Sequence, residues 1–490
     1  MKLFLENSDN IYAAQQLFYS LFPAEKLERT EVKRGADIVL KLTEQTGKLT
    51  AETRVRYRGK TATAQRTGQL EQDDPDPLQK GRITGKLLKL SFYAAAVKCL
   101  GAEPPWGAIT GVRPVKIPTK LLRQGVSEKS AQKELEKTYH VAEPQARLAM
   151  DCARYTLELD RALAASDIAL YIGIPFCPTR CAYCSFVSAD VGKSFGLLPP
   201  FLAALDREIE VTGRALKAQN LKINSLYIGG GTPTTLSADQ LRHLMEQVAA
   251  HMDLTGCKEY TVEAGRPDTI TAEKMAVLQQ CGATRVSVNP QSMEENVLRA
   301  MGRSHTPKAI LEAYSAARES GISAINMDLI AGLPADSVAG FCRSLDTVLA
   351  LNPENITVHT LALKKGSALL LDGAKNPLPT EEMVAEMLGY SSEKLREHGY
   401  QPYYLYRQKF MSGGFENVGW TRPGFESVYN VSMMEELCNI VSLGGGGVSK
   451  LVNRKTGHIE RVANPKYPKE YAENIEKILV QKERMAWPIN

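Results

Sequence analysis

Short apolar runs alternate with amphipathic stretches over the middle of the chain. Between residues 166 and 362, runs such as IALYIGI, INSLYIGG and EYTVEAG are followed by stretches of helical periodicity, such as FLAALDREIEVTGRAL, in about six successive steps. Repeated strand–helix steps of this kind predict a parallel sheet that is covered by helices. About six steps fit an open, partial (β/α)6 barrel of the TIM type, in which functional side chains lie at the carboxyl ends of the strands.

The regions on either side follow other patterns. The N-terminal region predicts a strand in MKLFLEN, a helix in NIYAAQQLFYSLF, a β-hairpin around Thr46-Gly47 and, after the polar linker EQDDPDP, further helices. The C-terminal region predicts a helix over 381–398, before an aromatic and glycine-rich stretch. We therefore predict an α/β protein of three domains: an α+β N-terminal domain (1–165), the partial barrel (166–362) and a mainly α C-terminal domain (363–490) that covers the substrate.

The composition indicates the cellular compartment of the protein and the state of its thiols. Hydrophobic residues make up 43% of the 490 residues and charged residues 23%, as in soluble globular proteins. No apolar run reaches the roughly 18 residues that span a bilayer, and the N-terminus turns polar too early for a secretory signal. We expect a cytoplasmic protein, in which thiols stay reduced. Six of the nine cysteines are scattered among apolar residues and are expected in the core: Cys99, Cys152, Cys257, Cys281, Cys342 and Cys438.

The charge of the chain does not point to a nucleic acid. The net charge is +5, and the basic excess lies in residues 1–165. Such an excess can bind an anionic partner, RNA or a poly-carboxylate ligand. No nucleic-acid-binding motif accompanies it, so we favour an ordinary solvated surface. Within this region, PPWGAITGVRPVKI is either a ligand-binding loop around Arg113 and Lys116 or a buried structural turn.

The stretch YIGIPFCPTRCAYCSF, from Tyr171 to Phe186, holds three cysteines in the pattern C-x3-C-x2-C: Cys177, Cys181 and Cys184. A structural zinc site normally has four protein ligands, and no histidine lies close by in the sequence. A cluster of four irons normally takes four thiolates. Three thiolates would leave one iron open to bind a reacting molecule, and we favour such a cluster over zinc.

Further glycine and polar residues follow the predicted strands. In YIGGGTPT, consecutive glycines let the backbone approach a ligand closely, although a glycine run alone also fits a tight turn. A carboxylate at the end of a predicted strand can accept hydrogen bonds from hydroxyl or amino groups, and an arginine can bind a carboxylate with two N–H groups. Each alone also fits a structural ion pair. The candidates are Glu263 in TVEAGRPD, Gln291 and Arg303 in VNPQSMEENVLRAMGRSHT, and Asp328 in NMDLIAGLP.

These motifs, in this order, resemble those of the radical S-adenosylmethionine (SAM) superfamily. Within it, YIGIPFC, with Tyr171 six residues before the first cysteine, resembles the oxygen-independent coproporphyrinogen III oxidase/dehydrogenase family, as do VNPQSMEENVLRAMGRSHT and DLIAGLP. PWGAITGVRPVKI, YYLYRQKFMSGGFENVGW, VYNVSMMEE and the long N-terminal region are most similar to the HemZ-type branch of this HemN/HemW-like family. The resemblance covers roughly residues 166–450.

The resemblance implies two cofactors and a reaction. Cys177, Cys181 and Cys184 would bind a [4Fe-4S] cluster, and its open iron would bind SAM. The residues implied in contacting one or two SAM molecules are Tyr171, Gly230, Gly231, Thr232, Glu263, Gln291, Arg303, Asp328 and Ala362. The implied reaction, in haem biosynthesis, is the oxidative decarboxylation of two propionates of coproporphyrinogen III to vinyls, which gives protoporphyrinogen IX. A donor such as flavodoxin or ferredoxin would reduce the cluster.

Departures from the family pattern keep other functions open. Phe186 stands where the established dehydrogenases have a fourth cysteine, and Gly173 where they have histidine. The haem-chaperone branch shares the phenylalanine, but Tyr429 replaces the histidine of its haem-binding element. The alternatives are a haem-binding or haem-delivery protein with a radical SAM fold and a radical SAM enzyme for another substrate. Among the histidines, His305 and His359 are the candidates for a role beside the site.

Overall fold

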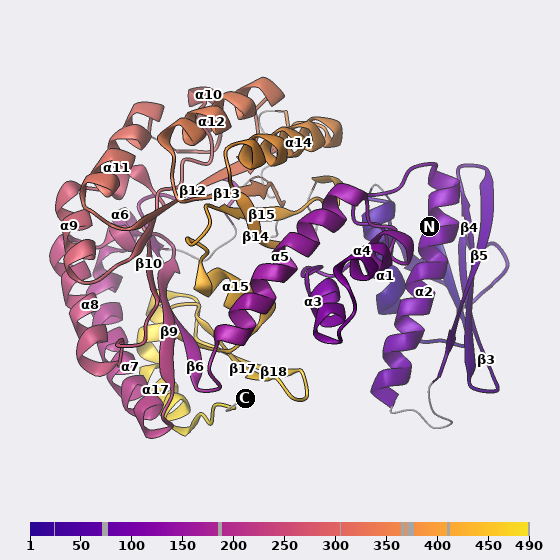
Figure 1. The fold of residues 1–490 in the computed structure, drawn as a ribbon, viewed down its shortest axis with the longest axis horizontal. Coiled ribbons are helices and arrows are strands. Elements are labelled where there is room, and N and C mark those ends of the chain that lie inside the picture. Colours follow the sequence, from indigo (N-terminus) through magenta and orange to yellow (C-terminus); the bar gives the residue numbers. More distant parts are fainter. Residues whose placement is uncertain are drawn as a thin grey trace. The chain divides into compact units, whose positions relative to one another are not determined.

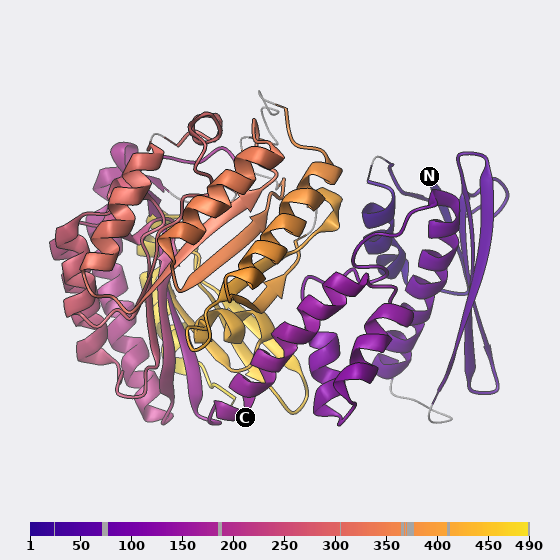
Figure 2. The same ribbon diagram turned by 45° about the horizontal axis from the view of Figure 1, so that its top comes forward.

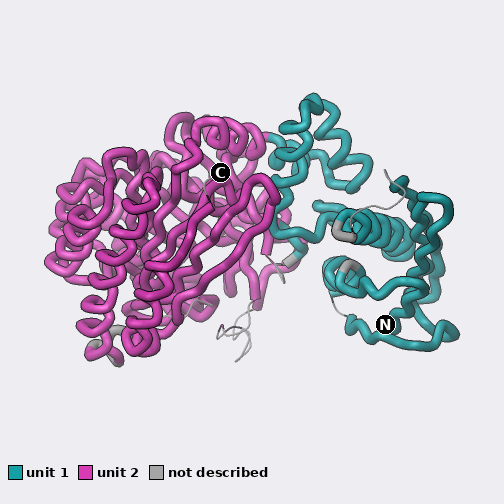
Figure 3. Tube along the Cα trace, turned by 90° about the horizontal axis from the view of Figure 1, so that it is seen from below, with its two compact units in different colours: residues 1–150, 413–415 teal, residues 151–412, 416–490 magenta. Residues whose placement is uncertain are grey.

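The computed structural model divides the chain into two compact units, which Figure 3 shows in different colours. The described residues are 1–23, 25–70, 77–184, 189–303, 305–363, 367, 369, 377–408 and 412–488. Unit 1 comprises residues 1–150 and 413–415, and unit 2 comprises residues 151–412 and 416–490. The division at residue 150 falls inside helix α5 (Glu143–Ala162). The domain limits expected at residues 165 and 362 stay predictions.

Unit 1 contains a five-stranded sheet of order β2-β1-β3-β4-β5. The strands are β1 (Lys2–Glu6), β2 (Glu28–Arg29), β3 (Ile38–Gln45), β4 (Lys48–Tyr57) and β5 (Lys60–Gln69). The predicted hairpin is confirmed: it joins β3 to β4, and Thr46 and Gly47 take positive φ angles in its turn. Because buried and exposed residues alternate along β4, one face of the sheet packs on a core.

Helices α1 (Ile11–Leu21) and α2 (Pro77–Leu100) supply the other side of this core. Leu17 and Phe18 of α1 and Phe92 of α2 are completely buried in it. The unit also includes the shorter helices α3 (Lys116–Arg123) and α4 (Glu128–Lys137). Of the predicted polar linker, residues 71–76 lie outside the described residues.

The Trp-Gly stretch of unit 1 is a buried turn. Trp106 is 1% exposed, and Gly107 has a φ angle of 51°. A Cβ atom on Gly107 would lie 2.1 Å from the carbonyl oxygen of Tyr139, and Ala108 N donates to the same oxygen at 2.8 Å. Only glycine allows this approach. Of the two interpretations of this stretch, these contacts agree with the structural turn.

Unit 2 contains one eleven-stranded sheet, and the parallel strands expected of the partial barrel lie at its centre. These are β6 (Asp167–Ile174), β9 (Lys222–Gly230), β10 (Glu259–Glu263), β11 (Arg285–Ser287), β12 (Ala324–Ala331) and β13 (Asn355–Thr360). Each pairs in parallel with the next in chain order. Strands of this kind are buried on both faces, which explains their apolar runs. The α/β class with a partial barrel is confirmed.

Helices connect these strands and lie outside the sheet of unit 2, as Figure 1 and Figure 2 show. They are α7 (Leu198–Ala218), α8 (Ala238–His251), α9 (Ala272–Gln280), α10 (Glu295–Ala300), α11 (Pro307–Glu319) and α12 (Val338–Leu351). Their buried residues recur at helical spacing, which is how the sequence revealed them. None of the helices in the described ranges is long and apolar enough to cross a membrane.

The C-terminal segment contains more strand than the mainly α domain expected from the sequence. Its strands are β14 (Gln401–Tyr406), β15 (Asn417–Thr421), β16 (Asn439–Gly444), β17 (Val448–Asn453) and β18 (His458–Ala463). Its helices are α14 (Glu381–Glu397), α15 (Val428–Glu435), α16 (Pro468–Glu473) and α17 (Ile475–Arg484). β15 pairs with β13 at one edge of the barrel strands, and β16 pairs with β6 at the other. The segment thus covers backbone groups that open sheet edges would leave unpaired.

The glycine run after β16 passes very close to β6. A Cβ atom on Gly444 would lie 2.3 Å from the carbonyl oxygen of Gly173, and one on Gly173 would lie 2.5 Å from that of Gly445. Gly445 N donates to Gly173 O at 3.1 Å. The two backbones leave no room for side chains between them. Gly173, which departs from the histidine of the family pattern, is therefore required by the path of the C-terminal segment.

Candidate active site

A pocket in unit 2 is lined by residues of the parallel strands and of the segments beyond their carboxyl ends. All of the residues expected to bind the cluster or SAM line it, except Tyr171. They come from the short strand β7 (Phe176–Cys177) and the loop after it, from the ends of β9, β10 and β12, and from segments after β11 and β13. The fold therefore brings motifs that are far apart in the sequence to one place, as a barrel predicts.

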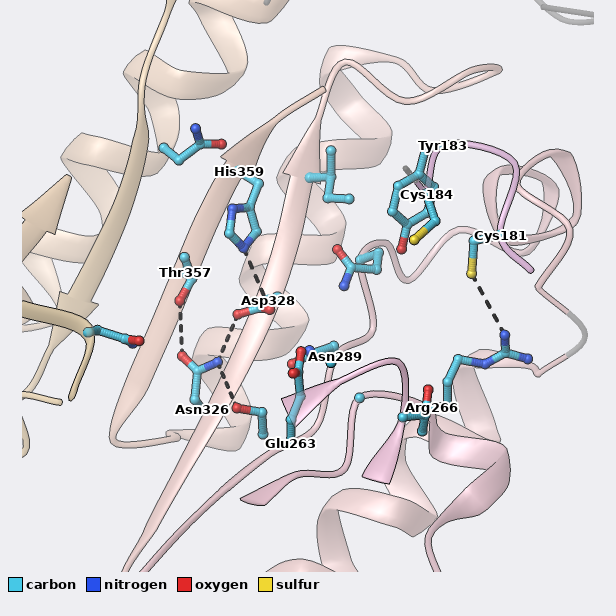
Figure 4. A pocket seen from close by; sticks show the side chains of 18 of the residues that line it. Cys181, Tyr183, Cys184, Glu263, Arg266, Asn289, Asn326, Asp328, Thr357 and His359 are labelled. Atoms are coloured by element: carbon cyan, nitrogen blue, oxygen red, sulfur yellow. Dashed lines mark hydrogen bonds and ion pairs between the residues drawn. The ribbon is translucent and has the colours of Figure 1, made fainter. Parts of the chain in front are cut away.

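The three cysteines of the motif share this pocket. Cys181 is buried, Cys177 and Cys184 are half-buried, and none of the three is joined to another cysteine in a disulfide. Thr232 Oγ1 donates to Cys177 Sγ at 3.5 Å, and Arg266 Nη1 donates to Cys181 Sγ at 3.7 Å (Figure 4). Donors beside thiols favour the thiolate, which is the form that binds iron. The donor set fits a cluster held by three thiolates.

Two further observations concern the metal ligands. Within the described ranges, no three His, Cys, Asp or Glu side chains converge closely enough to hold one metal ion. The thiolates of a four-iron cluster bind different irons and do not have to converge in this way. Phe186, which stands where a fourth cysteine occurs in the family pattern, lies outside the described residues.

The glycine run after β9 holds the segment that carries Cys177. Gly231 N donates to Ile174 O at 2.8 Å, and Thr232 N donates to Phe176 O at 2.7 Å. A Cβ atom on Gly231 would lie 2.4 Å from Phe176 O. The sequence predicted a close approach to a ligand; the structure shows a close approach of the run to the cysteine segment itself. Glycine at this position is thus needed to seat that segment.

Replacement of Gly231 with alanine is expected to lower the cluster content. The new Cβ atom would overlap backbone atoms of Phe176, so the chain before Cys177 must shift, at a cost of roughly 1–3 kcal/mol. Iron and sulfide content after anaerobic reconstitution measures the effect. Gly389→Ala is the control, because nothing lies within 4 Å of a Cβ atom there and alanine favours its helix. Equal iron content in the two variants would contradict this role of Gly231.

Two carboxyl groups of the pocket differ in their protonation. Burial raises the pKa of Glu263 to about 8, with a further contribution from the charge of Asp328 and an opposing one from the backbone of Gly230. Burial acts on Asp328 as well, but its interactions with His359 and then Asn326 hold its pKa below the ordinary value. At neutral pH Asp328 is charged and Glu263 is largely protonated. The pair can therefore accept hydrogen bonds from a ligand and donate one to it.

The raised pKa of Glu263 predicts a pH dependence of stability. A carboxyl whose folded-state pKa lies above its ordinary 4.5 contributes stability that is fully present below that pH and is lost as the pH rises through about 8. The free energy of unfolding of the cofactor-free protein is expected to fall over this window by at most about 5 kcal/mol more than that of Glu263→Gln. Denaturant titrations at several pH values measure both proteins. Parallel pH curves would contradict the raised pKa.

Gln291 and Arg303 present polar atoms that have no partner within the protein. Gln291 takes a φ angle of 66°, and its backbone N donates to Asp328 O at 2.8 Å. Arg303 donates to Asn289 O at 2.7 Å and to Tyr183 Oη at 3.1 Å. Gln291 Oε1 and Arg303 Nε are buried and make no hydrogen bond. Because buried polar atoms are rarely left unpaired, these atoms are suited to bind a ligand.

A network of polar side chains extends from Asp328 along the same pocket (Figure 4). His359 Nε2 lies 3.6 Å from Asp328 Oδ2, and His359 Nδ1 lies 3.4 Å from Tyr406 Oη. Asn326 donates to Asp328 Oδ1 at 2.8 Å, and its Oδ1 accepts from Thr357 Oγ1 at 3.0 Å. The sequence pattern singled out His359 and the aromatic stretch that contains Tyr406, but not Asn326. The signal that could have revealed Asn326 is the alternation of side chains along a strand. Residues two apart, such as Asn326 and Asp328, lie on the same face.

The chain is similar to known proteins in sequence. The Radical SAM superfamily matches residues 171–347. The oxygen-independent coproporphyrinogen-III oxidase-like protein HemZ of Bacillus subtilis (strain 168) is 42% identical over 385 residues, which are 77% of this chain and 76% of that protein. The chain belongs to the oxygen-independent coproporphyrinogen III oxidase-like family of radical SAM proteins. Membership in this superfamily implies a [4Fe-4S] cluster and SAM as cofactors.

Other members of this HemN/HemW-like family carry two kinds of name. The oxygen-independent coproporphyrinogen III oxidase of Pseudomonas aeruginosa is 32% identical over 60% of this chain and 63% of that protein. The heme chaperone HemW of Bacillus subtilis (strain 168) is 33% identical over 50% of this chain and 64% of that protein. In fold, the chain is similar to coproporphyrinogen III oxidase (HemN) from Escherichia coli, with a TM-score of 0.53 and 22% identity over 68% of this chain and 73% of that one.

In this family member Tyr171 lies behind the pocket wall. Its ring centroid is 6.2 Å from those of Tyr227 and Tyr429, and the latter two are 4.7 Å apart. Tyr227 is the member of this stack that lines the pocket. Tyr429 stands where the haem-chaperone branch has its histidine, and it is 4% exposed in a cluster of buried residues. At the position of that histidine, this chain therefore has a tyrosine that is packed in a stack of aromatic rings.

Proposed function

We propose that this protein catalyses the oxygen-independent oxidative decarboxylation of coproporphyrinogen III, which converts two propionates to vinyls and gives protoporphyrinogen IX. The observation that carries the proposal is the convergence of the cysteine motif with the expected SAM residues on one pocket. When the cluster and SAM are bound, radical SAM chemistry would supply hydrogen abstraction from the propionate carbon next to the macrocycle. Loss of CO2 and transfer of one electron to a one-electron acceptor would then leave the vinyl group.

The pocket residues would bind and orient the cofactors and the substrate. Cys177, Cys181 and Cys184 would hold the cluster. Arg303 would bind the carboxylate of SAM through its unpaired Nε, and Asp328 would accept hydrogen bonds from ribose hydroxyls. These assignments, and those of the remaining expected SAM residues, follow the family pattern. A one-electron donor such as flavodoxin or ferredoxin would reduce the cluster.

His359 and Tyr406 are the groups that we assign to the substrate side. Both line the pocket, His359 from β13 and Tyr406 from β14, and the two side chains are in contact. The side chain of His359 is 23% exposed, so part of it is accessible to a bound molecule. An imidazole N–H and a phenol O–H both donate hydrogen bonds that suit a propionate carboxylate. The same proposal includes the binding of one or two SAM molecules.

An anaerobic assay tests the reaction. Reconstituted protein is mixed with coproporphyrinogen III, SAM and dithionite or reduced flavodoxin, and the tetrapyrroles are separated by chromatography. We expect a mono-vinyl intermediate, then protoporphyrinogen IX, with two 5′-deoxyadenosines formed per product. Formation of 5′-deoxyadenosine without any vinyl product would refute this substrate and favour a radical SAM enzyme for another one.

A haem-binding or haem-delivery role is the second candidate function. It is supported by the 33% identity to a haem chaperone, and the burial of Tyr429 at the histidine position speaks against it. Haem titration, followed by the Soret absorbance, decides between the two. Tight, stoichiometric haem binding together with no conversion of coproporphyrinogen III would replace the first proposal with the second.

A further inference from the structure

Arg266 lies in the loop after β10, close to the segment that carries the cysteines (Figure 4). The residue is 3% exposed, and its guanidinium is always charged. A buried charge must be paired and hydrogen-bonded, because desolvation otherwise makes it very costly. The hydrogen-bond partners of the three guanidinium nitrogens therefore indicate the role of this arginine.

Asp268 fixes the orientation of this guanidinium. Arg266 Nε donates to Asp268 Oδ1 and Nη2 donates to Asp268 Oδ2, both at 2.9 Å. A two-point contact between planar groups restricts rotation of the guanidinium. His305 Nδ1 also lies 3.9 Å from Asp268. Burial, and then the charge of Arg303, lower the pKa of His305 to about 4, so at neutral pH His305 does not compete as a cation for Asp268.

The remaining nitrogen of Arg266 faces the cysteine segment. Nη1 donates to Thr179 Oγ1 at 3.1 Å and to Thr179 O at 3.4 Å. The same nitrogen donates to Cys181 Sγ at 3.7 Å, a distance typical of a bond to the larger sulfur atom. Cys181 is itself 9% exposed, so solvent screens this contact little. Asp268 thus holds a positive charge and an N–H group against the sulfur of one cluster ligand.

We propose that Arg266 is a positioning residue that raises the reduction potential of the cluster through its contact with the Cys181 thiolate. When the donor delivers one electron, the cluster and its thiolates gain one negative charge and no covalent bond changes. A fixed cation beside a ligand sulfur stabilises this more negative state more than the oxidised one, and hydrogen bonds to the sulfurs are known determinants of cluster potential. The inference requires the cluster but does not depend on the identity of the substrate.

A purely structural role for Arg266 makes a different prediction. In that case its contacts with Thr179 would hold the loop, and the potential of a fully loaded cluster would not depend on the arginine. Arg303 also interacts with Cys181, but it is expected to bind SAM, so its variants would change two properties together. Arg266 is not among the expected SAM residues, which makes it the better residue for this test.

The test is an EPR-monitored redox titration of the reconstituted full-length protein without SAM or substrate. Arg266→Gln removes the charge, and Arg266→Lys keeps a charge but cannot bind both Asp268 oxygens and still reach Cys181. Thr179→Val is the matched control, because it removes the hydroxyl acceptor and leaves the sulfur contact. We expect the midpoint potential to become more negative in the order wild type, Arg266→Lys, Arg266→Gln, with Thr179→Val unchanged.

Several outcomes would overturn the proposal. One of them is an Arg266→Gln protein that holds a complete cluster and has the same midpoint potential as the wild type. If that variant does not hold a cluster, Arg266→Lys decides the question, and a wild-type midpoint there also overturns it. A shift in Thr179→Val as large as that in Arg266→Gln would assign the effect to the loop. Since no substrate is present, failure of the coproporphyrinogen III assay would leave this measurement valid.

Discussion

Replacement of Cys181 with alanine is expected to abolish the [4Fe-4S] cluster. Cys181 is buried in the wall of the pocket, and a cluster held by three thiolates cannot lose one of them and keep its iron. We expect iron and sulfide to fall from about four each per chain to near zero after anaerobic reconstitution. The broad visible absorption of the cluster and the reductant-dependent formation of 5′-deoxyadenosine should disappear together.

Cys281→Ala is the matched control for this experiment. Cys281 is half-buried at the end of α9 and does not line the pocket, so its removal should leave the iron content unchanged. Circular dichroism of both apoproteins verifies that the fold is retained. A full complement of iron in Cys181→Ala would refute the assignment of this cysteine as a ligand, and stoichiometric zinc in the wild type would refute the cluster itself.

Replacement of Glu208 with alanine is expected to destabilise unit 2 by about 3–5 kcal/mol. Glu208, on α7, is completely buried, and Lys482 of α17 is 2% exposed. Lys482 Nζ lies 3.5 Å from Glu208 Oε1. Burial lowers the pKa of Lys482, and Glu208 opposes this effect. Without Glu208 the buried ammonium would keep its hydrogen bonds to Ser442 O and Ser449 Oγ but lose its counter-charge, and this penalty makes up most of the expected loss.

The same carboxylate also supports the C-terminal segment. Glu208 Oε2 accepts from Gly444 N at 2.8 Å and from Tyr471 Oη at 2.6 Å, and Asn464 Nδ2 donates to Oε1 at 2.8 Å. Gly444 is the residue that passes against Gly173 of β6. Loss of Glu208 is therefore expected to loosen the pairing of β16 with the strand that leads to the cysteines.

Denaturant titration measures this prediction, with Glu210→Ala as the control. Glu210 lies on the same helix and pairs with Arg214, but it is largely exposed, so its loss should cost less than about 1 kcal/mol. The double variant Glu208→Leu/Lys482→Met should recover part of the stability, because it leaves no buried charge. The hydrogen bonds that Glu208 accepts from Gly444 N, Tyr471 Oη and Asn464 Nδ2 stay lost. A single-variant loss no larger than that of Glu210→Ala would show that the buried pair contributes little.

The barrel could be predicted from the sequence because its signals are local. The barrel strands of unit 2 are short apolar runs, and most of the helices between them show helical periodicity over nine residues or more. Since parallel strands end on the same edge of a sheet, polar residues in the carboxyl-terminal half of the strands, such as Glu263 and Asp328, could be assigned to one site from their positions in the sequence. The pocket contains both.

The C-terminal segment was harder to predict because its strands depend on distant partners. β16 pairs with β6, more than 250 residues earlier in the chain, and no local pattern identifies that partner. The tyrosines of β14 fit a buried strand and a ligand-facing surface equally well. In the structure they do both: Tyr403 is 1% exposed and also lines the pocket.

The role of Arg266 shows the same limit within the site. TVEAGRPD revealed its glutamate as a strand-end carboxylate, but the arginine gave no signal of its own. Its contact with Cys181 joins residues 85 positions apart. Such a contact exists only once the fold brings the loop after β10 to the cysteine segment, so a sequence without its fold cannot reveal it.

The sequence alone determined the cysteine spacing, the order of the strand-end motifs and the strand–helix alternation, because each depends on residues close together in the chain. The tertiary structure decided which strands complete the edges of the sheet, that Glu208 pairs with Lys482, and that Gly173 must be glycine because another backbone lies against it. Pairing and packing bring distant segments together, and their free energy depends on the shape and charge of both partners. A periodic pattern along one segment describes that segment alone and gives no information about its partner.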